Sequence, residues 1–147
     1  MSRPAPGTRA DYAAFSTHAT RWRDNDVYGH LNNVVHYELF DAAVNGWLIG
    51  QGLLDPLGGA QIGLVVETGC RYHAELGFPE PVAAGIRVAK LGTSSVRYEI
   101  GLFGGDAESA AAEGFFVHVY VDAQTRRPVP LSAELGAGLE RLVQAPR

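Results

Sequence analysis

Apolar residues recur at spacings of three and four between residues 31 and 48, which is typical of one broad apolar face on an α-helix. The members of this face are Leu31, Val34, Val35, Leu39, Phe40, Ala43, Val44, Trp47 and Leu48. Gly50 and Gly52 follow, and glycine commonly ends a helix. The pattern therefore predicts a long helix that starts near residue 31 and buries one side.

Most of the remaining chain has the pattern of β-strands. A first strand is expected before the helix, where Phe15, Thr17 and Ala19 alternate with His18, Thr20 and Trp22. Turn residues divide the later part of the chain into four more runs. The five predicted strands span residues 14–23, 62–76, 81–92, 94–104 and 108–122.

The two ends of the chain are expected to be simpler. Residues 1–13 contain Pro4, Pro6 and Gly7 and are predicted to form a flexible N-terminal arm. Ser132 is a candidate N-cap for a short C-terminal helix.

The order of these elements predicts the fold class. A strand, a long helix and then four strands leave one helix to cover the apolar face of about five strands. The first two strands cannot pair through a tight turn, because the helix lies between them. We expect an α+β fold in one domain, residues 1–147, with a curved antiparallel sheet wrapped around the helix.

Composition narrows the class of function. Apolar residues make up 46% of the chain and charged residues 19%, as in globular proteins. The net charge of −4 gives no support to nonspecific nucleic-acid binding. No apolar run approaches the roughly 18 residues of a membrane span, and the first residues lack the apolar core of a signal peptide. The single cysteine, Cys70, excludes an internal disulfide and fits a reducing compartment. We therefore expect a cytoplasmic protein that binds neither nucleic acid nor membrane.

The stretch "RDNDVYGHLNN", residues 23–33, places polar groups directly before the predicted helix. A helix leaves its first N–H groups without intrahelical partners and carries partial positive charge there. Asn32 or Asn33 is placed to cap it, and Gly29 permits a turn. Asp26 has two possible roles: it caps the helix, or it attacks, or activates water toward, a carbonyl whose oxygen the free N–H groups hold. Spacing alone leaves both open.

The longer stretch "RDNDVYGHLNNVVHYELFDAA" resembles the signature of hotdog-fold acyl-CoA thioesterases of the 4-hydroxybenzoyl-CoA thioesterase-like family. The residues that carry the resemblance are Asp24, Asp26, Gly29, His30, Asn32, Asn33, Phe40, Asp41 and Ala43. The chain departs from the pattern where His36 holds the place of a family tyrosine and Tyr37 follows it. The order of elements extends the resemblance over most of residues 14–143.

The resemblance implies a curved sheet around a central helix, with subunits paired so that the active sites lie between them. It implies hydrolysis of an acyl-CoA thioester without a metal or a cofactor, since coenzyme A is part of the substrate. The carboxylate that matches the family's catalytic group is Asp26, as nucleophile or general base. The backbone N–H near Asn33 would polarise the thioester carbonyl, which agrees with the reading of the residues alone.

The other polar residues of the stretch have alternative roles. Asp24 is expected to hold the loop by accepting backbone N–H groups. His30 is expected to orient Asp26, to contact the substrate, or simply to pack. Tyr28 either lines the acyl pocket or seals the loop, and Gly29 and Asn32 complete the expected substrate-binding set. His36, Glu38 and Asp41 do not converge on one helix face, so no metal site is expected.

Coenzyme A requires partners for its phosphates. "KLGTSS", residues 90–95, would let backbone N–H groups approach a phosphate or the pantetheine arm, so Lys90, Thr93 and Ser94 are candidates. Arg127 follows the last strand, where a loop can fold over a nucleotide. The alternative for Lys90 and Arg127 is that each is a solvated surface charge with no role in binding.

The sequence leaves open which acyl group the pocket accepts and how many subunits assemble. Phe40, Trp47, Val65 and Tyr72 are candidates for the wall of a fatty or an aromatic acyl pocket. Exposed strand edges need cover, so we expect a homodimer, or a homotetramer, joined edge to edge through the sheets.

Two rival functions remain on the same architecture. A hydratase or dehydratase would favour a D-x-N-P-x-H loop, and "DNDVYGH" has no proline and a different spacing. A non-catalytic acyl-thioester-binding protein would need no carboxylate, and Asp26 is present.

Overall fold

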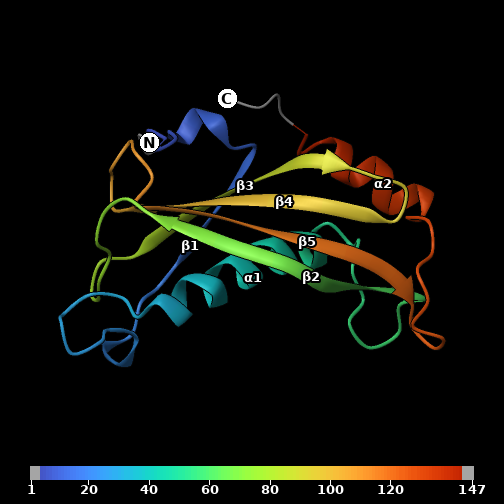
Figure 1. The fold of residues 1–147 in the computed structure, drawn as a ribbon, viewed down its shortest axis with the longest axis horizontal. Helices are drawn as coiled ribbons and strands as arrows, with labels where there is room; N and C mark the ends of the chain where they lie inside the picture. Colours follow the sequence, from blue (N-terminus) through green and yellow to red (C-terminus); the bar gives the residue numbers. More distant parts are fainter. Residues whose placement is uncertain (1–3, 144–147) are drawn as a thin grey trace.

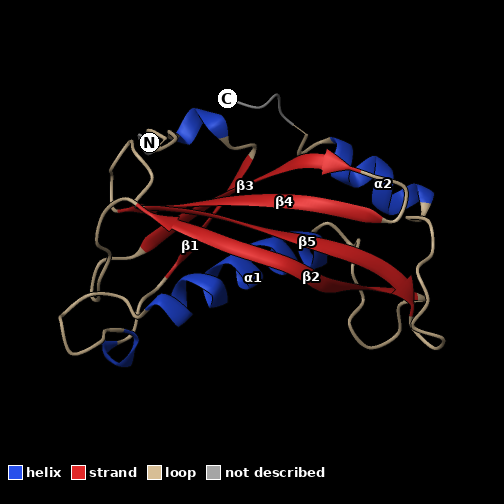
Figure 2. Ribbon diagram, in the orientation of Figure 1, coloured by secondary structure: helices blue, strands red, loops and turns tan. Residues whose placement is uncertain are grey.

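The computed structural model describes residues 4–143, in which one long helix lies along one face of a five-stranded sheet (Figures 1 and 2). Its elements in chain order are a 3₁₀ helix Arg9–Asp11, β1 Ala14–His18, a 3₁₀ helix Trp22–Asp24, α1 Asn33–Gly50, β2 Gln61–Tyr72, β3 Val82–Leu91, β4 Ser95–Gly104, β5 Ala112–Asp122 and α2 Ala133–Glu140. The predicted α+β fold, a curved sheet around one long helix, is confirmed.

The sheet is antiparallel throughout, in the order β1-β3-β4-β5-β2. The first two strands of the chain therefore form its opposite edges, which agrees with the expectation that they do not pair through a tight turn. The register shifts between Val65 and Glu67 in β2 and between Val88 and Lys90 in β3. Such bulges bend a strand and increase its twist, which helps the sheet curve around α1.

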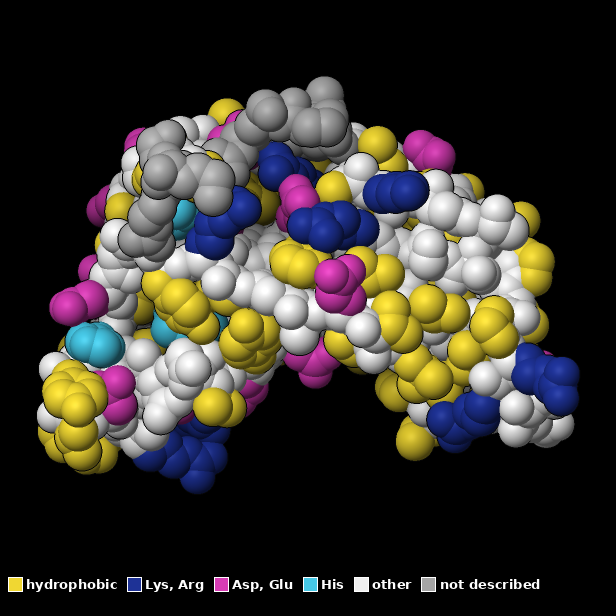
Figure 3. All heavy atoms as spheres, viewed as in Figure 1, with side chains coloured by type: hydrophobic (Ala, Val, Ile, Leu, Met, Phe, Trp, Pro, Cys, Tyr) yellow, Lys and Arg dark blue, Asp and Glu magenta, His cyan; other side chains and the backbone are white. Residues whose placement is uncertain are grey.

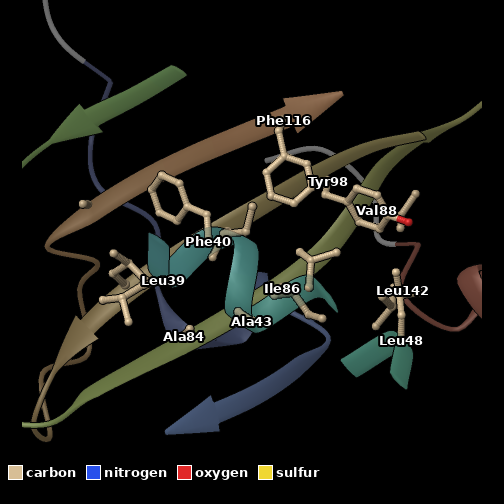
Figure 4. Packing of buried hydrophobic residues seen from close by; sticks show 14 of the residues in the cluster. Leu39, Phe40, Ala43, Leu48, Ala84, Ile86, Val88, Tyr98, Phe116 and Leu142 are labelled. Carbon is tan, nitrogen blue, oxygen red and sulfur yellow. The ribbon is translucent and has the colours of Figure 1, made fainter. Parts of the chain in front are cut away.

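The core lies between α1 and the face of the sheet that curves around it. Alternate residues of a strand point to one face, and on β3 and β4 those that face α1 are buried. Figure 4 shows Phe40 and Ala43 of α1 packed among side chains from three strands, namely Ala84, Ile86, Val88, Tyr98 and Phe116. This packing fixes the axis of α1, and so the position of its N-terminus.

The predicted C-terminal helix is present as α2. The side chain of Ser132 accepts a hydrogen bond from the Leu135 amide at 3.1 Å, so Ser132 is the N-cap. Leu135, Leu139 and Leu142 belong to the same core as Leu48, and the Val88 amide donates to the Leu142 carbonyl. Figure 1 shows α2 at the end of the sheet where the β3–β4 turn lies.

Some predicted boundaries are wrong. The first strand ends at His18 rather than residue 23, because Trp22–Asp24 forms a 3₁₀ turn. The second strand ends at Tyr72 rather than residue 76. Both shortened segments contribute loops to the same end of the sheet.

Part of the segment predicted as a flexible arm, residues 4–13, makes defined contacts with the sheet, whereas residues 1–3 lie outside the described part. The Gly7 amide donates to Glu113 Oε1 at 3.0 Å, and its carbonyl accepts from the Ala110 amide. Tyr12 is only 6% exposed and packs edge-on against Phe103. Burial of an aromatic ring explains why a segment rich in proline and glycine is ordered.

Within residues 4–143, no helix has both the length and the apolar character that a membrane crossing requires.

Candidate active site

Asp26 sits in a tight turn just before α1. Its Oδ1 accepts the Tyr28 amide at 2.8 Å, and its own amide donates to the His30 carbonyl at 2.9 Å. Gly29 has a φ of 87°, a backbone conformation that other residues rarely adopt. The main chain of the turn therefore fixes the carboxylate of Asp26 through Oδ1.

His30 is the neighbour of the second carboxylate oxygen. Its Nδ1 lies 3.6 Å from Asp26 Oδ2, and its Nε2 lies 3.8 Å from Glu75 Oε1. The Tyr28 ring is stacked beside the imidazole, with centroids 6.3 Å apart. Both His30 distances exceed a hydrogen bond, so small movements of the ring would let it bond to either carboxylate.

The first turn of α1 leaves a backbone donor free. Asn32 is the N-cap, since its side chain accepts from the Val34 amide at 3.0 Å and its carbonyl accepts from the Val35 amide at 2.9 Å. The amide of Asn33 has no hydrogen-bond partner among residues 4–143. This amide lies at the positive end of the helix, where it is available to an anionic or partly anionic oxygen.

Asp24 anchors the loop that carries Asp26. Its side chain is buried, and it accepts the Arg21 amide at 2.8 Å and two guanidinium nitrogens of Arg21 at 3.0 and 2.8 Å. Hydrogen bonding to Arg21 holds the pKa of the Asp24 carboxyl below its ordinary value. The Asp24 carbonyl accepts the Asn32 amide at 2.9 Å, so the predicted loop-holding role is confirmed.

A second set of bonds ties the loop to the β2–β3 connection. Asn25 Oδ1 accepts the Phe78 amide at 3.0 Å, and the Leu31 amide donates to the Leu76 carbonyl at 2.7 Å. Segments 45 to 53 residues apart in the sequence are therefore held side by side at one end of the sheet.

A cavity of about 350 Å³ opens where these segments meet α1. It is lined by Asp26, His30, Leu31, Asn32, Asn33, His36, Tyr72, Ala74, Glu75 and Leu76. Four of the residues singled out from the sequence, Asp26, His30, Asn32 and Asn33, thus share one cavity. Tyr28 and Gly29 shape the turn instead, and the Tyr28 side chain is largely exposed.

The inner wall of this cavity carries no charge near neutral pH. Burial lowers the pKa of His36, whose Nδ1 lies 3.3 Å from the Asn32 carbonyl oxygen, so the imidazole stays neutral. Tyr72 crosses His36 edge-on with ring centroids 5.0 Å apart, and burial raises the pKa of its hydroxyl. A neutral wall suits the acyl part of a substrate better than its phosphates.

Sequence reasoning missed part of this wall. Of four apolar pocket candidates, only Tyr72 lines the cavity, since Phe40 is fully buried in the core and Trp47 and Val65 lie elsewhere. Glu75 and Leu76 carried no local signal, because only the folded β2–β3 connection brings them to Asp26.

The four candidates for phosphate binding belong to the end of β3, the β3–β4 turn and the loop after β5. Figure 1 shows these segments at the end of the sheet opposite to the N-terminus of α1. The Thr93 and Ser94 carbonyls accept amides of Leu131 and Tyr120, and the Arg127 carbonyl accepts the Asp122 amide. Within one chain, neither these residues nor Lys90 line the Asp26 cavity. Their role at the phosphates stays a prediction.

Neither a metal cluster nor a reactive thiol marks the site. Among the described residues, no group of three or more His, Cys, Asp and Glu side chains is placed to hold a metal ion. Burial raises the pKa of Cys70 to about 11, so its thiol stays protonated near neutral pH.

Comparison with solved structures identifies proteins of the same shape. The PA5185 protein of Pseudomonas aeruginosa is 48% identical, over 96% of this chain and 98% of that one, with a TM-score of 0.92. A thioesterase of Thermus thermophilus, solved with coenzyme A and zinc, is 25% identical over 90% and 95% of the two chains, with a TM-score of 0.73. DHNA-CoA thioesterase of Staphylococcus aureus, 18% identical over 87% of each chain with a TM-score of 0.76, shares the fold.

No curated protein sequence matches the chain. The family model of the thioesterase-like superfamily, however, matches residues 20–139, which include the Asp26 turn, α1 and the whole sheet except β1. The chain therefore belongs to the thioesterase-like superfamily.

Proposed function

We propose that the protein is an acyl-CoA thioesterase, which hydrolyses an acyl-CoA to a carboxylic acid and coenzyme A. One observation carries the proposal: the Asp26 carboxylate and the free Asn33 amide line the same cavity at the N-terminus of α1. Acyl transfer needs these two parts together, a base or nucleophile and a donor for the developing oxyanion. The complex of the Thermus relative with coenzyme A supports the choice of ligand.

In the proposed reaction, the thioester carbonyl oxygen accepts the Asn33 N–H. Charge that develops on this oxygen is stabilised by the helix N-terminus. Asp26 then acts in one of two ways: it removes a proton from water that attacks the acyl carbon, or it attacks that carbon itself and the resulting anhydride is hydrolysed. In both cases the C–S bond breaks and the thiolate of coenzyme A leaves and takes up a proton. Because a carboxylate is a weak base, its fixed position must supply much of the rate.

His30 is assigned a positioning role. It lies between Asp26 and Glu75, within 4 Å of both carboxylates. A hydrogen bond from its ring to Oδ2 would leave Asp26 one defined orientation toward the cavity, because Oδ1 is already held by the Tyr28 amide.

We further propose that the working unit is a homodimer, or a homotetramer of two such dimers, joined through β2. This 12-residue edge strand has no neighbour on its outer side within the described chain. Its central residues Leu64, Val65 and Val66 are 39%, 52% and 61% exposed, and Figure 3 shows hydrophobic side chains gathered above a hollow in this face. An unprotected apolar edge of this length is suited to pairing with a second copy.

Antiparallel pairing of two β2 strands would also unite the two halves of the predicted site. It places the Tyr72 end of one strand beside the Gln61 end of the other. In its own chain Gln61 pairs with Asp122, whose amide bonds to the Arg127 carbonyl. Arg127 of the partner subunit would then approach the Asp26 cavity, and the phosphates would be bound by the chain that does not supply the carboxylate.

A panel of acyl-CoA substrates, from short aliphatic to aromatic, with detection of free thiol, tests the activity. We expect thiol release for at least one acyl class from the wild type and very little from Asp26→Asn. Hydration of an enoyl-CoA without thiol release would instead establish a hydratase. Binding of acyl-CoA without turnover of any member would establish a binding protein.

A further inference from the structure

A serine and a histidine form a hydrogen-bonded pair on β1, at the other edge of the sheet. Ser16 Oγ lies 2.8 Å from His18 Nε2. Residues two apart on a strand point to the same face, and here that face is the one turned toward α1. Neither residue takes part in the Asp26 site.

The pair opens into a cavity of about 390 Å³ between β1 and α1. Its lining is Ala14, Phe15, Ser16, His18, Ala42, Ala43, Gly46, Trp47, Gly50, Gln51, Ala84 and Ile86. None of these residues is charged, and none lines the Asp26 cavity. A Cβ added at Gly46 or Gly50 would meet nothing within 4 Å, so the helix leaves real space in front of the pair.

Partial burial lowers the pKa of His18, which favours a neutral imidazole near neutral pH. The charged groups beside it are Arg21, Asp24 and Glu38, which line an adjoining hollow together with His18, and Arg21 is bonded to both carboxylates. With its proton on Nδ1, the neutral ring can accept the Ser16 hydroxyl proton at Nε2.

We propose that Ser16 and His18 form a second acyl-transfer site, separate from Asp26, that accepts small apolar acyl groups from activated esters or thioesters. Ser16 is the nucleophile and His18 the general base. The apolar lining holds the acyl group, and Trp47 forms one wall of the cavity.

The step is a substitution at the acyl carbon. Ser16 Oγ bonds to this carbon while His18 Nε2 takes the hydroxyl proton. The bond to the phenolate or thiolate leaving group then breaks, and the leaving group takes up the proton from His18 Nε2. Water next attacks the acyl carbon and gives a proton to His18, which passes it to Ser16 Oγ as the bond between Oγ and the acyl carbon breaks and the carboxylic acid is released.

The second half of the cycle is expected to be slow. Among residues 4–143, no carboxylate lies within ion-pair distance of His18, so the base lacks the third group that orients a catalytic histidine. The acyl-serine should therefore accumulate, which makes it measurable.

The test uses p-nitrophenyl butyrate and the Asp26→Asn protein, so that the proposed thioesterase site does not contribute. We expect a burst of about one p-nitrophenolate per chain, and a butyryl group on Ser16 in the mass spectrum of the peptides. Ser16→Ala should abolish the burst, and His18→Gln should slow it on the order of 10²-fold. Lowering the pH through the depressed pKa of His18 should slow it as well.

Thr17→Ala is the matched control, because Thr17 is a hydroxyl residue on the same strand that does not line this cavity. It should leave the burst intact. All four variants are compared by thermal melting, and Ser16→Ala on the Asp26 wild type should hydrolyse acyl-CoA normally. An equal burst from the Ser16→Ala protein, or butyrylation at other residues only, would overturn the second site without touching the proposed function.

Discussion

Two aspartates, two positions apart, have different surroundings in the structure. Asp24 is buried and accepts three hydrogen bonds from Arg21, whereas the Asp26 side chain is partly exposed at the cavity, and only its Oδ1 has a backbone partner. We expect Asp26→Asn to lower kcat on the best acyl-CoA on the order of 10²-fold or more, because it removes the charge and keeps the shape. Affinity for an unreactive coenzyme A analogue should stay nearly unchanged.

Asp24→Asn is the control for this prediction. It should lower the free energy of unfolding by about 1–2 kcal/mol, since it weakens a buried charge-assisted bond, and it should affect kcat less than Asp26→Asn does. Thermal melting and kcat are measured on both proteins. A near wild-type kcat for Asp26→Asn would reduce Asp26 to a loop anchor.

His118 supports a prediction about pH and stability. It is 4% exposed, Nδ1 has no partner in the described chain, and burial lowers its pKa to about 4. Between that value and its ordinary pKa of about 6.5, the unfolded chain binds a proton that the folded chain does not. Stability should therefore fall as pH falls through this window, by about 2 kcal/mol at pH 5 from this residue.

His118→Phe should remove that part of the loss, because phenylalanine can keep the stacking on Phe116 and does not titrate. Urea unfolding of both proteins at pH 7.5 and pH 5 measures the difference. An identical loss of stability in both proteins would assign the pH dependence to other groups.

At the residue scale, the sequence predicted the site only where its members are neighbours in the chain. Asp26, His30, Asn32 and Asn33 belong to one turn and one helix start, and the structure places all four at one cavity, although spacing alone left the role of Asp26 open. Glu75 and Leu76 join them through bonds between loops, such as the Leu31 amide to the Leu76 carbonyl, which no local pattern encodes.

At the scale of elements, the site depends on how α1 rests on the sheet. Gly114 of β5 faces the fully buried ring of Phe40, and a Cβ at position 114 would collide with that ring. Gly114→Ala should destabilise the protein by about 1–3 kcal/mol through overpacking. It should also lower activity, since the helix that carries the Asn33 amide must shift.

Gly136→Ala provides the opposite case within α2, where an added Cβ meets nothing within 4 Å. It should stabilise the protein by about 0.5–1 kcal/mol, the difference in helix propensity between the two residues. The denaturant midpoints of both variants are compared with that of the wild type. An unchanged midpoint for Gly114→Ala would show that Phe40 can repack.

Element types were predictable because each follows a local period. The three-and-four spacing of α1 and the alternation in the strands come from one buried face each. The ends were not predictable where a side-chain hydrogen bond or the burial of one ring decides them. Residues 19–23 continue a strand-like pattern, but Asp24 turns the chain by bonding to Arg21. Residues 4–13 contain loop formers, but the Tyr12 ring finds an apolar surface on the sheet.

At the scale of the whole molecule, the exposed edge of β2 predicts self-association. Val66→Lys would place a charge near the middle of that edge, and in a two-fold antiparallel pair it would face the same charge on the partner. We expect light scattering to show monomers and kcat/KM to fall sharply. Thr17→Lys, on the opposite edge strand β1, should leave both unchanged, and an active Val66→Lys monomer would exclude an interface at β2.

Phosphate binding belongs to the same scale, because its candidates lie far from Asp26 within one chain. Alanine at Lys90 or Arg127 should raise KM for acyl-CoA with little change in kcat, because it removes binding common to ground and transition states. The salt dependence of KM should weaken too. An unchanged KM in both single variants and in the double variant would rule these cations out.

A mixing experiment separates a site within one chain from a site shared by two. Asp26→Asn chains and Arg127→Ala chains are each defective, but in a mixed dimer with shared sites one site combines wild-type Asp26 with wild-type Arg127. After unfolding and refolding of an equal mixture, about half of the dimers should be mixed, each with one intact site of two. The kcat/KM per chain should then recover to roughly a quarter of the wild-type value, with a wild-type KM in the recovered fraction. If each site belonged to a single chain, no site would hold both residues and the mixture would show only the average of its two components. The wild-type KM in the mixture is therefore the result that only a shared site can produce.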